Sequence, residues 1–292
     1  MSAFTLLVGD ALERLRELPD DSVQTCVTSP PYWGLRDYGV EGQIGLEATS
    51  GEFLSRLVAV FREVRRVLRP DGTCWVNMGD TYASSGRGGG VGENSTINGS
   101  HQAAAQAARA KLTNRIVGAK AKDKLGIPWR VAFALQDDGW WFRSDIVWHK
   151  PNPMPESVRD RPTVAHEFIF LLSKSEKYFY NTPEARERRV VGAVDVVEFR
   201  NWRDVWTIAT QPSSLEHFAA FPEELARRCI IAGSKHGDMV LDPFAGTGTT
   251  GVVALTEGRR FVGVELNPAY AEMAEQWSRS ITPSLFLAGG AR

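Results

Sequence analysis

The chain has 292 residues, of which 43% are hydrophobic, and a formal net charge of -1 at pH 7. This size and composition are those of an ordinary globular protein with a buried core. No apolar run reaches the roughly 18 residues that a membrane span needs, and the N-terminus lacks the basic start and apolar stretch of a secretory signal, so we expect a cytoplasmic protein with no membrane partner.

The three cysteines and five histidines are scattered, with no pair at metal-ligand spacing. We therefore expect reduced thiols and no metal site.

Because the net charge is close to zero, a nucleic-acid surface would have to be a local patch. The segment from 84 to 130 is the best candidate, since it holds eight basic residues against two acidic ones, although a solvated loop is the alternative.

The expected elements alternate between strand and helix, as in a parallel α/β sheet. In the first half they are a strand at 4–8, a helix ending at 18, a strand at 23–27, a helix at 53–68 and a strand at 73–78. Asp10 and Glu13 are typical of a capping box for the first helix. Pro70-Asp71-Gly72 predicts a turn after the second helix.

Residues 84–100 are rich in Gly, Ser and Asn and show no periodicity, which indicates an inserted loop. The pattern then continues with a helix at 129–135, strands at 141–148 and 168–172, a helix at 222–232, a strand at 239–241, a helix at 249–257, a strand at 261–265 and a final helix. We therefore predict an α/β fold with a doubly wound, mostly parallel sheet and one insertion.

A glycine-rich turn connects the predicted strand at 239–241 to the next helix. Residues 240–251 read VLDPFAGTGTTG, and Glu265 ends the following strand. Glycines let the backbone approach a nucleoside cofactor closely, and a carboxylate after the second strand can bind both ribose hydroxyls. No Lys follows the glycines, which argues against a P-loop for phosphate.

Two nucleoside cofactors remain open at this point, a nicotinamide dinucleotide and S-adenosylmethionine. Asp242, directly before the glycines, would repel a pyrophosphate but suits a cofactor with a sulfonium and an ammonium group. The fingerprint also lies too near the C-terminus to complete the usual half of a dinucleotide fold. S-adenosylmethionine is favoured, and an NAD-dependent oxidoreductase is the more distant alternative.

A second motif, Ser29-Pro30-Pro31-Tyr32, follows the strand at 23–27, where ligands bind in open α/β sheets. The prolines stiffen the turn and leave carbonyl oxygens free to accept hydrogen bonds. An exocyclic amine is a poor nucleophile, and the Ser29 hydroxyl and Pro30 carbonyl could accept its N–H groups and free its lone pair. Tyr32 offers a stacking surface for a flipped base.

Together these motifs resemble the β class of DNA amino-methyltransferases, in which the catalytic motif precedes an FxGxG cofactor motif. The resemblance runs from about residue 4 to about residue 277, and residues 27–32 look like the N4-cytosine form. N6-adenine enzymes of the class usually carry Asp or Asn in place of Ser29. The resemblance implies a class I, Rossmann-like methyltransferase that moves a methyl group from S-adenosylmethionine to N4 of a flipped cytosine at specific DNA sites; N6 of adenine is the alternative acceptor.

The resemblance also assigns the site residues, and the catalytic ones are Ser29, Pro30, Pro31 and Tyr32. Glu265 is implied as the ribose-binding acid and Asp10 as the acid near the adenine ring, with a plain helix cap as the alternative role of Asp10. The segment 217–222 resembles the part of the family beside the methionine end of the cofactor. The expected cofactor contacts are Asp10, Thr28, Phe218, Asp242, Pro243, Phe244, Ala245, Gly246, Gly248, Glu265 and Leu266.

DNA is expected to contact the segments outside the sheet, at 84–124 and 184–203, through arginines and lysines. The expected contacts in these segments are Arg115, Arg188 and Arg200, and Lys150 and Arg161, in stretches that resemble family segments near the catalytic cleft, are expected to contact the DNA backbone. For Lys150 and Arg161 surface ion pairs are the alternative. The implied division of this single domain is a catalytic half at 1–83, a target-recognition insertion at 84–127, further strands and a second DNA-contact region at 128–210, and a cofactor half at 211–292.

Other chemistries are less well supported. Methylation of cytosine C5 needs a nucleophilic cysteine, which in that family follows a proline, and no Pro-Cys pair occurs. A DNA-binding protein without activity is disfavoured because both motifs are intact, and His166 is expected to be structural rather than a base. Besides DNA, the resemblance leaves a homodimer and a cognate restriction endonuclease open as partners.

Overall fold

The computed structural model describes residues 2–34, 38–83, 120, 122–191, 196–211 and 221–288. The strands are β1 (Phe4–Val8), β2 (Val23–Thr28), β3 (Leu68–Met78), β4 (Trp141–His149), β5 (His166–Ser173), β6 (Arg186–Val191), β7 (Val196–Asn201), β8 (Val205–Thr207), β9 (Met239–Asp242) and β10 (Arg260–Glu265). The helices are α1 (Ala11–Leu15), α2 (Ser50–Val67), α4 (Ile127–Asp137), α5 (Glu223–Gly233), α6 (Thr249–Thr256) and α7 (Pro268–Ala288).

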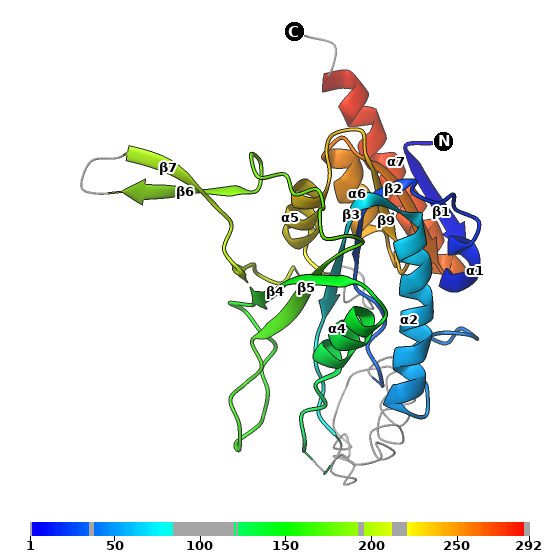
Figure 1. The fold of residues 1–292 in the computed structure, drawn as a ribbon, viewed down its shortest axis with the longest axis vertical. Helices are drawn as coiled ribbons and strands as arrows, with labels where there is room; N and C mark the ends of the chain where they lie inside the picture. Colours follow the sequence, from blue (N-terminus) through cyan, green and yellow to red (C-terminus); the bar gives the residue numbers. More distant parts are fainter. Residues whose placement is uncertain are drawn as a thin grey trace.

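Within the described residues one large sheet has the strand order β1-β10-β9-β2-β3-β5-β4-β8. β5 runs antiparallel to both of its neighbours, β3 and β4, and the other pairings are parallel. The predicted mostly parallel α/β sheet is therefore confirmed. β6 and β7 form a separate antiparallel hairpin that projects from the body (Figure 1).

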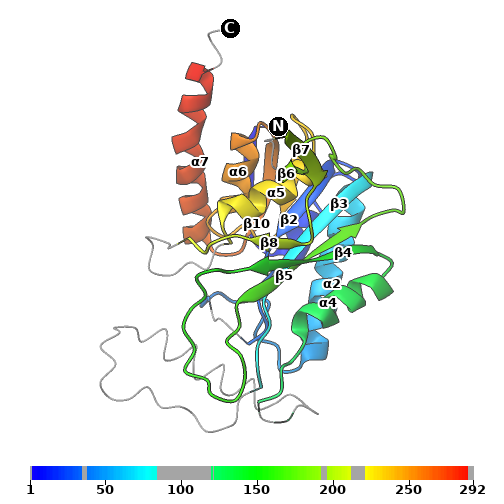
Figure 2. The same ribbon diagram turned by 90° about the vertical axis from the view of Figure 1, so that its left-hand side faces the viewer.

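The sheet is the middle of three layers (Figure 2). Helices α1, α2 and α4 cover one face, where Leu15, Phe61 and Leu135 join one buried apolar cluster. Helices α5 and α6 cover the other face, where Leu225 and Val253 join a second cluster. Every residue of β2 is buried, as expected for a central parallel strand that is covered on both faces.

Two helix boundaries differ from the sequence prediction. α2 begins at Ser50 rather than at residue 53, because Thr49 and Glu52 form a complete capping box in front of it. α1 ends at Leu15 rather than at residue 18. Asp10 does cap α1 by accepting hydrogen bonds from the backbone N–H groups of Leu12 and Glu13, but the structure shows this half of the predicted box alone.

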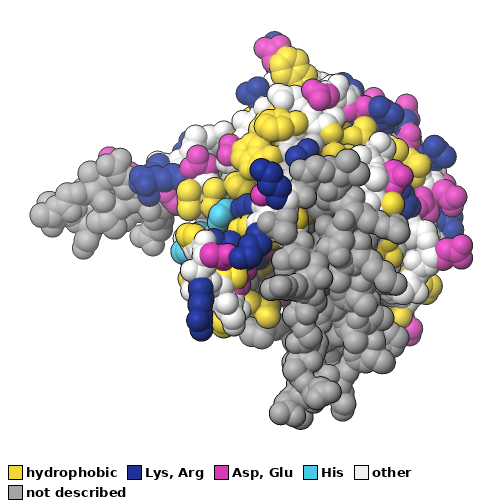
Figure 3. Space-filling view, turned by 90° about the horizontal axis from the view of Figure 1, so that it is seen from below, with side chains coloured by type: hydrophobic (Ala, Val, Ile, Leu, Met, Phe, Trp, Pro, Cys, Tyr) yellow, Lys and Arg dark blue, Asp and Glu magenta, His cyan; other side chains and the backbone are white. Residues whose placement is uncertain are grey.

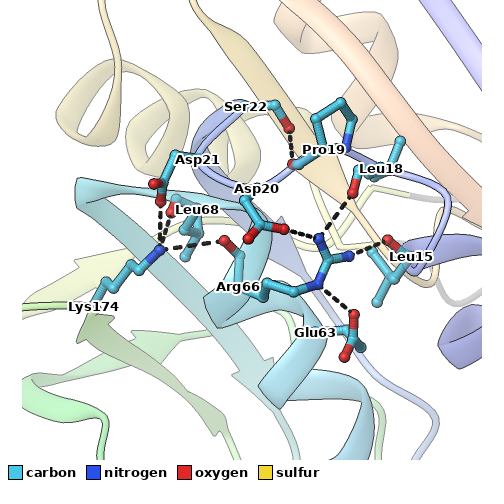
Figure 4. A network of polar contacts seen from close by, with 10 residues as sticks. All are labelled: Leu15, Leu18, Pro19, Asp20, Asp21, Ser22, Glu63, Arg66, Leu68 and Lys174. Carbon is cyan, nitrogen blue, oxygen red and sulfur yellow. Dashed lines mark hydrogen bonds and ion pairs between the residues drawn. The ribbon is translucent and has the colours of Figure 1, made fainter.

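The early end of α1 has a visible cause in the side chain of Arg66, on the last turn of α2 (Figure 4). Its guanidinium donates to the carbonyl oxygens of Leu15 (2.8 Å) and Leu18 (3.0 Å) and pairs with Asp20 and with Glu63 (2.7 Å). Carbonyl groups at a helix C-terminus have no partner within the helix, and a cation there satisfies both their charge and their hydrogen bonds.

The predicted turn at Pro70-Asp71-Gly72 is part of a strand in the structure. β3 begins at Leu68, and its pairing with β2 shifts from Val23 opposite Leu68 to Thr25 opposite Thr73. The extra residues on β3 bulge out of the ladder, so a proline and a glycine are tolerated there.

Among the described helices none is long and apolar enough to cross a membrane.

Candidate active site

A cavity of about 1020 Å³ opens at the carboxyl ends of β9, β2 and β3. β9 and β2 are neighbours in the sheet, but the strands that follow them, β10 and β3, lie on opposite sides of this pair. Such a reversal of strand order opens a crevice above the strand ends. The turn that begins at Ser29 and the glycine turn that begins at Pro243 therefore line the same cavity.

Asp242 ends β9, and its carboxylate is buried below the glycine turn. Oδ1 accepts hydrogen bonds from the Thr28 hydroxyl (2.6 Å) and the Phe244 backbone N–H (3.0 Å), and Oδ2 accepts one from the Thr250 hydroxyl (2.7 Å). Burial raises the pKa of Asp242 to about 6, and these hydrogen bonds oppose the rise. Asp242 thus links β2 to the glycine turn and changes its charge close to neutral pH.

Glu265 ends β10 and also faces the cavity. Its Oε2 accepts a hydrogen bond from the Gly246 N–H and its Oε1 one from the Asn267 N–H, each at 2.8 Å. Burial raises the pKa of Glu265, and the two N–H groups lower it. Because each carboxylate oxygen has a second lone pair, Glu265 can still accept hydrogen bonds from two neighbouring hydroxyls.

The two glycines of the motif have different roles. Gly246 has φ +54°, and a side chain added there would meet no atom within 4 Å. Because Gly246 has no side chain, a ligand in the cavity can approach its backbone closely. Gly248 has φ +90°, and an added Cβ would lie 2.8 Å from Cβ of Ala274 on α7. Gly248 therefore permits close packing of α7 against the turn rather than direct contact with a ligand.

Ser29, Pro30, Pro31 and Tyr32 all line the cavity. The Ser29 hydroxyl lies 3.4 Å from the phenolic oxygen of Tyr32, to which it donates a long hydrogen bond. Within the described part of the chain, no donor reaches the carbonyl oxygen of Pro30. The turn therefore presents a hydroxyl and a carbonyl oxygen from adjacent residues as acceptors for a ligand.

Tyr32 is held by a carboxylate that the sequence interpretation missed. Its hydroxyl donates to Oε2 of Glu167 (2.9 Å), which also accepts from the Asn77 amide (3.2 Å), and Glu167 Oε1 pairs with the Lys150 ammonium (2.5 Å). Burial and the Glu167 charge raise the pKa of the Tyr32 phenol well above its usual range. Tyr32 therefore stays protonated, and its side chain is fixed in one orientation.

The sequence held only part of the information needed to find Asn77 and Glu167. Asn77 lies near the end of β3, and Thr28 pairs with its neighbour Val76, so strand adjacency would have placed it in the cavity. Glu167 reaches the cavity from the antiparallel strand β5, which has no local motif. His166, beside it, packs edge-on against Phe168 at 5.3 Å, and burial lowers its pKa, which favours the neutral imidazole.

Residues 23–276 match a family model for N6 and N4 methyltransferases that is described as DNA methylase. The chain belongs to this family of DNA methylases. The Type II methyltransferase M.Cfr9I of Citrobacter freundii is 54% identical to it over 94% of this chain and 87% of the relative. M.SmaI of Serratia marcescens is 48% identical over 93% and 89%, respectively. This family match excludes the alternative prediction of an NAD-dependent oxidoreductase.

Two solved structures share the fold of this DNA methylase. TTHA0409 of Thermus thermophilus, complexed with S-adenosyl-L-methionine, has a TM-score of 0.62 and 28% identity, covering 95% of this chain and 96% of the other. The PvuII DNA methyltransferase, whose name gives it as cytosine-N4-specific, has a TM-score of 0.66 at 20% identity, covering 96% and 92%. The class I methyltransferase fold and S-adenosylmethionine as the cofactor are thus confirmed.

The cavity fits this cofactor. Glu265 offers carboxylate oxygens for a ribose, Gly246 leaves the wall open, and Asp242 places an anionic group near the glycine turn for a cationic ligand. Most predicted contacts line the cavity, namely Asp10, Asp242, Pro243, Phe244, Ala245, Gly246, Glu265 and Leu266.

Three predicted cofactor contacts differ from these. Thr28 is buried behind the cavity wall and directs its hydroxyl to Asp242. Gly248 also lies behind the wall, against Ala274. Neither residue lines the cavity in this structure. Thr28 and Gly248 instead hold the backbone of the glycine turn in place, through Asp242 and Ala274 respectively. Phe218 lies outside the described residues.

The predicted DNA contacts of this methylase lie in ion pairs where the structure describes them. Lys150 pairs with Glu167 and lies 4.2 Å above the Trp148 ring, inside the cavity. Arg161 pairs with Glu156 (2.7 Å), lies 3.9 Å above the Tyr82 ring and lines the same cavity. Arg200 pairs with Glu187 (2.6 Å) across the β6–β7 hairpin. Arg115 and the Arg188 side chain lie outside the described residues.

Proposed function

We propose that this DNA methyltransferase transfers the methyl group to N4 of cytosine, at specific DNA sites, after the base has been flipped out of the duplex. The observation that carries the proposal is the turn Ser29–Tyr32, which presents a hydroxyl and a carbonyl acceptor in the same cavity as Asp242 and Glu265. An amino group with two N–H donors matches this pair of acceptors.

The residues act by preparing the nitrogen. The N4 lone pair of cytosine is delocalised into the ring, and hydrogen bonds from its two N–H groups to Ser29 Oγ and the Pro30 carbonyl favour a pyramidal nitrogen with a free lone pair. S-adenosylmethionine supplies, when bound, an electrophilic methyl group. In the proposed transfer the N4–CH3 bond would form as the bond between the methyl group and the sulfonium sulfur breaks, a neutral thioether would leave and the surplus N4 proton would pass to solvent, so no covalent bond to the enzyme is needed.

Tyr32 completes the base site. Glu167 fixes the phenol, and Gly79 lets the ring sit close to the backbone, since a Cβ there would lie 3.0 Å from Cε2 of Tyr32. A ring held in this way offers a pre-organised surface on which a flipped base can stack. We propose that role for Tyr32, with Glu167 as its positioning residue.

The decisive experiment is to incubate the protein with S-adenosylmethionine and DNA of mixed sequence and to identify methylated nucleosides by mass spectrometry. The expected product is N4-methylcytosine. Ser29→Ala removes one acceptor and is expected to lower product formation about a hundredfold while leaving cofactor affinity unchanged. Ser22→Ala is the matched control, because Ser22 precedes β2 at the opposite end of the strand and its hydroxyl bonds only to the Pro19 carbonyl among the described residues.

If the product is N6-methyladenine, the assignment of cytosine as the target base is wrong, although the chain still belongs to the same family of DNA methylases. That alternative is disfavoured by Ser29 alone, where N6-adenine enzymes of the class usually carry Asp or Asn. No methylated nucleoside on any DNA, despite cofactor binding, would indicate RNA or protein as the acceptor, whereas undetectable cofactor binding would favour a non-catalytic DNA-binding protein. Because several relatives are named Type II methyltransferases, we also propose that the chain protects DNA from a cognate restriction endonuclease, and that it works in the cytoplasm. A homodimer stays a prediction.

A further inference from the structure

The loop between β4 and β5, residues 150–165, forms one side of the cavity mouth. Besides Lys150 and Arg161, its residues Asn152, Met154 and Val164 line the cavity. The loop thus lies on the same cavity as Ser29 and Tyr32, where a flipped base would have to be received. Any role of this loop in opening the duplex rests on the proposed base-flipping function.

Met154 is the unusual residue of this loop. Its exposed fraction is 86%, the highest among the exposed large hydrophobic residues that the structure describes. It stands between Pro153 and Pro155, and each proline fixes its own backbone and restricts the residue before it. An apolar side chain is therefore held out into solvent by a stiff backbone, beside a cavity of the size that a base and a cofactor need.

The loop is anchored at both sides of Met154. Asn152 exchanges hydrogen bonds with the backbone of Thr210, accepting from its N–H (2.9 Å) and donating to its carbonyl (3.2 Å). The Lys150 N–H bonds to the Ala165 carbonyl (2.8 Å), which closes the base of the loop. These bonds fix the position of the methionine relative to the cavity.

One cation of the same loop is available to a polyanion, since Lys150 and Arg161 are already paired with Glu167 and Glu156. Arg159 is exposed and forms no ion pair with any described residue. Seen from below, the described part of this end carries Lys and Arg side chains next to apolar ones, with Asp and Glu side chains among them (Figure 3). A cation that can bind a phosphate next to a protruding apolar side chain is a feature of proteins that insert a wedge between base pairs.

We propose that Met154 enters the base stack of the duplex and fills the space that the flipped base leaves. Leaving a gap in the stack is costly, and an unbranched thioether side chain can adapt to the faces of the neighbouring bases. Met154 therefore stabilises the flipped state and takes no part in methyl transfer itself.

The test compares Met154→Ala on two duplexes. The site that the wild-type protein methylates is first located by sequencing, and a duplex with this site is then prepared intact and with the base opposite the target removed. On the intact duplex kcat/KM is expected to fall about tenfold or more, because the flipped state loses its support. On the duplex with the missing base, where pairing no longer opposes flipping, the loss is expected to be less than about threefold.

A fluorescent cytosine analogue at the target position reports flipping directly. Its signal is expected to rise on binding of the wild-type protein and of Met154→Phe, which keeps an apolar wedge, but not of Met154→Ala. The control is Met273→Ala on α7, where the side chain is 37% exposed and outside the cavity lining. Cofactor affinity, measured by calorimetry, is expected to be unchanged in all three variants.

The proposed insertion of Met154 is wrong if Met154→Ala methylates the intact duplex as fast as the wild type, or if it loses the same activity on both duplexes. Neither result would contradict the proposed methyl transfer to cytosine. If instead the wild-type protein methylates no DNA, the proposed function fails and the wedge fails with it. The behaviour of the wild-type protein thus separates the two failures.

Discussion

At the scale of single residues, Asp242 has the most unusual electrostatic position. A carboxylate at the end of a buried strand would normally be costly, and three hydrogen-bond donors reduce that cost without removing it. Its pKa of about 6 lies above the ordinary value of 3.8. The native state therefore binds the Asp242 proton more tightly than the unfolded chain does.

Ionisation of Asp242 works against folding. Protonated Asp242 favours the native state, so its stabilisation is complete below the unfolded pKa of 3.8 and is lost as the pH rises through about 6. Asp242→Asn does not titrate. The free energy of unfolding of the wild type, relative to this variant, is expected to fall by about 1 kcal/mol between about pH 5 and pH 7. Denaturant unfolding across this range measures it.

The cofactor should reverse that balance. A cationic ligand favours the ionised carboxylate, so S-adenosylmethionine is expected to bind the wild type more tightly above about pH 6 than below it, and Asp242→Asn is expected to bind with little pH dependence. Calorimetric titrations at several pH values test this. Equal pH profiles for the two proteins would show that Asp242 has only a structural role.

Single residues could be predicted where one local motif carries them. Ser29, Asp242 and Glu265 each end or follow a strand, and the parallel sheet brings such positions to one edge, so all three line the cavity. Glu167 could not be predicted, because the chain reverses direction before β5 and the pairing of this strand depends on long-range contacts. Thr28 was placed near the cofactor, but its side chain points to Asp242.

At the scale of elements, the network around Arg66 and Lys174 joins α1, α2 and the start of β2 (Figure 4). Lys174 donates to the carbonyl oxygen of Leu68 and pairs with Asp21, each at 2.6 Å. Arg66 binds the carbonyls that end α1. These contacts lie at the edge of the sheet opposite the cavity, so they stabilise the fold without touching the site.

Arg66→Ala is expected to lower the free energy of unfolding by about 2 kcal/mol, because the Leu18 carbonyl is left without any donor among the described residues and the Leu15 carbonyl keeps only the Leu18 N–H (3.1 Å). The matched control is Arg62→Ala on the same helix, whose side chain is 65% exposed and pairs with Asp138. Its loss is expected to be below about 0.5 kcal/mol. Thermal denaturation compares the two variants. A methylation rate that drops in Arg66→Ala below its unfolding temperature would contradict a purely structural role.

The bounds of a helix or strand could be predicted where the periodicity of apolar residues determines them. They could not be predicted where a side chain from a distant part of the sequence determines them. The core of α2 follows from its apolar spacing, while the end of α1 depends on Arg66, far away in sequence. The β6–β7 hairpin has no apolar alternation that points to a core, because it forms its own sheet outside the body. The segment 184–203 was therefore found by its arginines and not by its strands.

At the scale of the whole molecule, the order of the motifs in the sequence sets the architecture. The strand before the serine motif, β2, and the strand before the glycine motif, β9, come from opposite halves of the chain and pair at the centre of the sheet. This pairing brings the two motifs to one cavity, and the division of the chain into a catalytic and a cofactor half stays a prediction. Most of the predicted recognition insertion, 84–127, lies outside the described residues, so its role stays a prediction.

The β6–β7 hairpin provides a test of how recognition is separated from catalysis. Its base is the pair Arg186 and Asn201, and it projects from the sheet that carries the site (Figure 1). Replacing residues 187–200 by two glycines is expected to leave cofactor affinity unchanged and to weaken DNA binding about tenfold or more, with a shallower dependence of the binding constant on salt, because arginine–phosphate contacts are lost. Arg279→Ala on α7, where the arginine side chain is 75% exposed, is the control for a lost surface arginine. Unchanged DNA affinity and salt dependence would remove the hairpin from the DNA interface and leave recognition to the remaining segments.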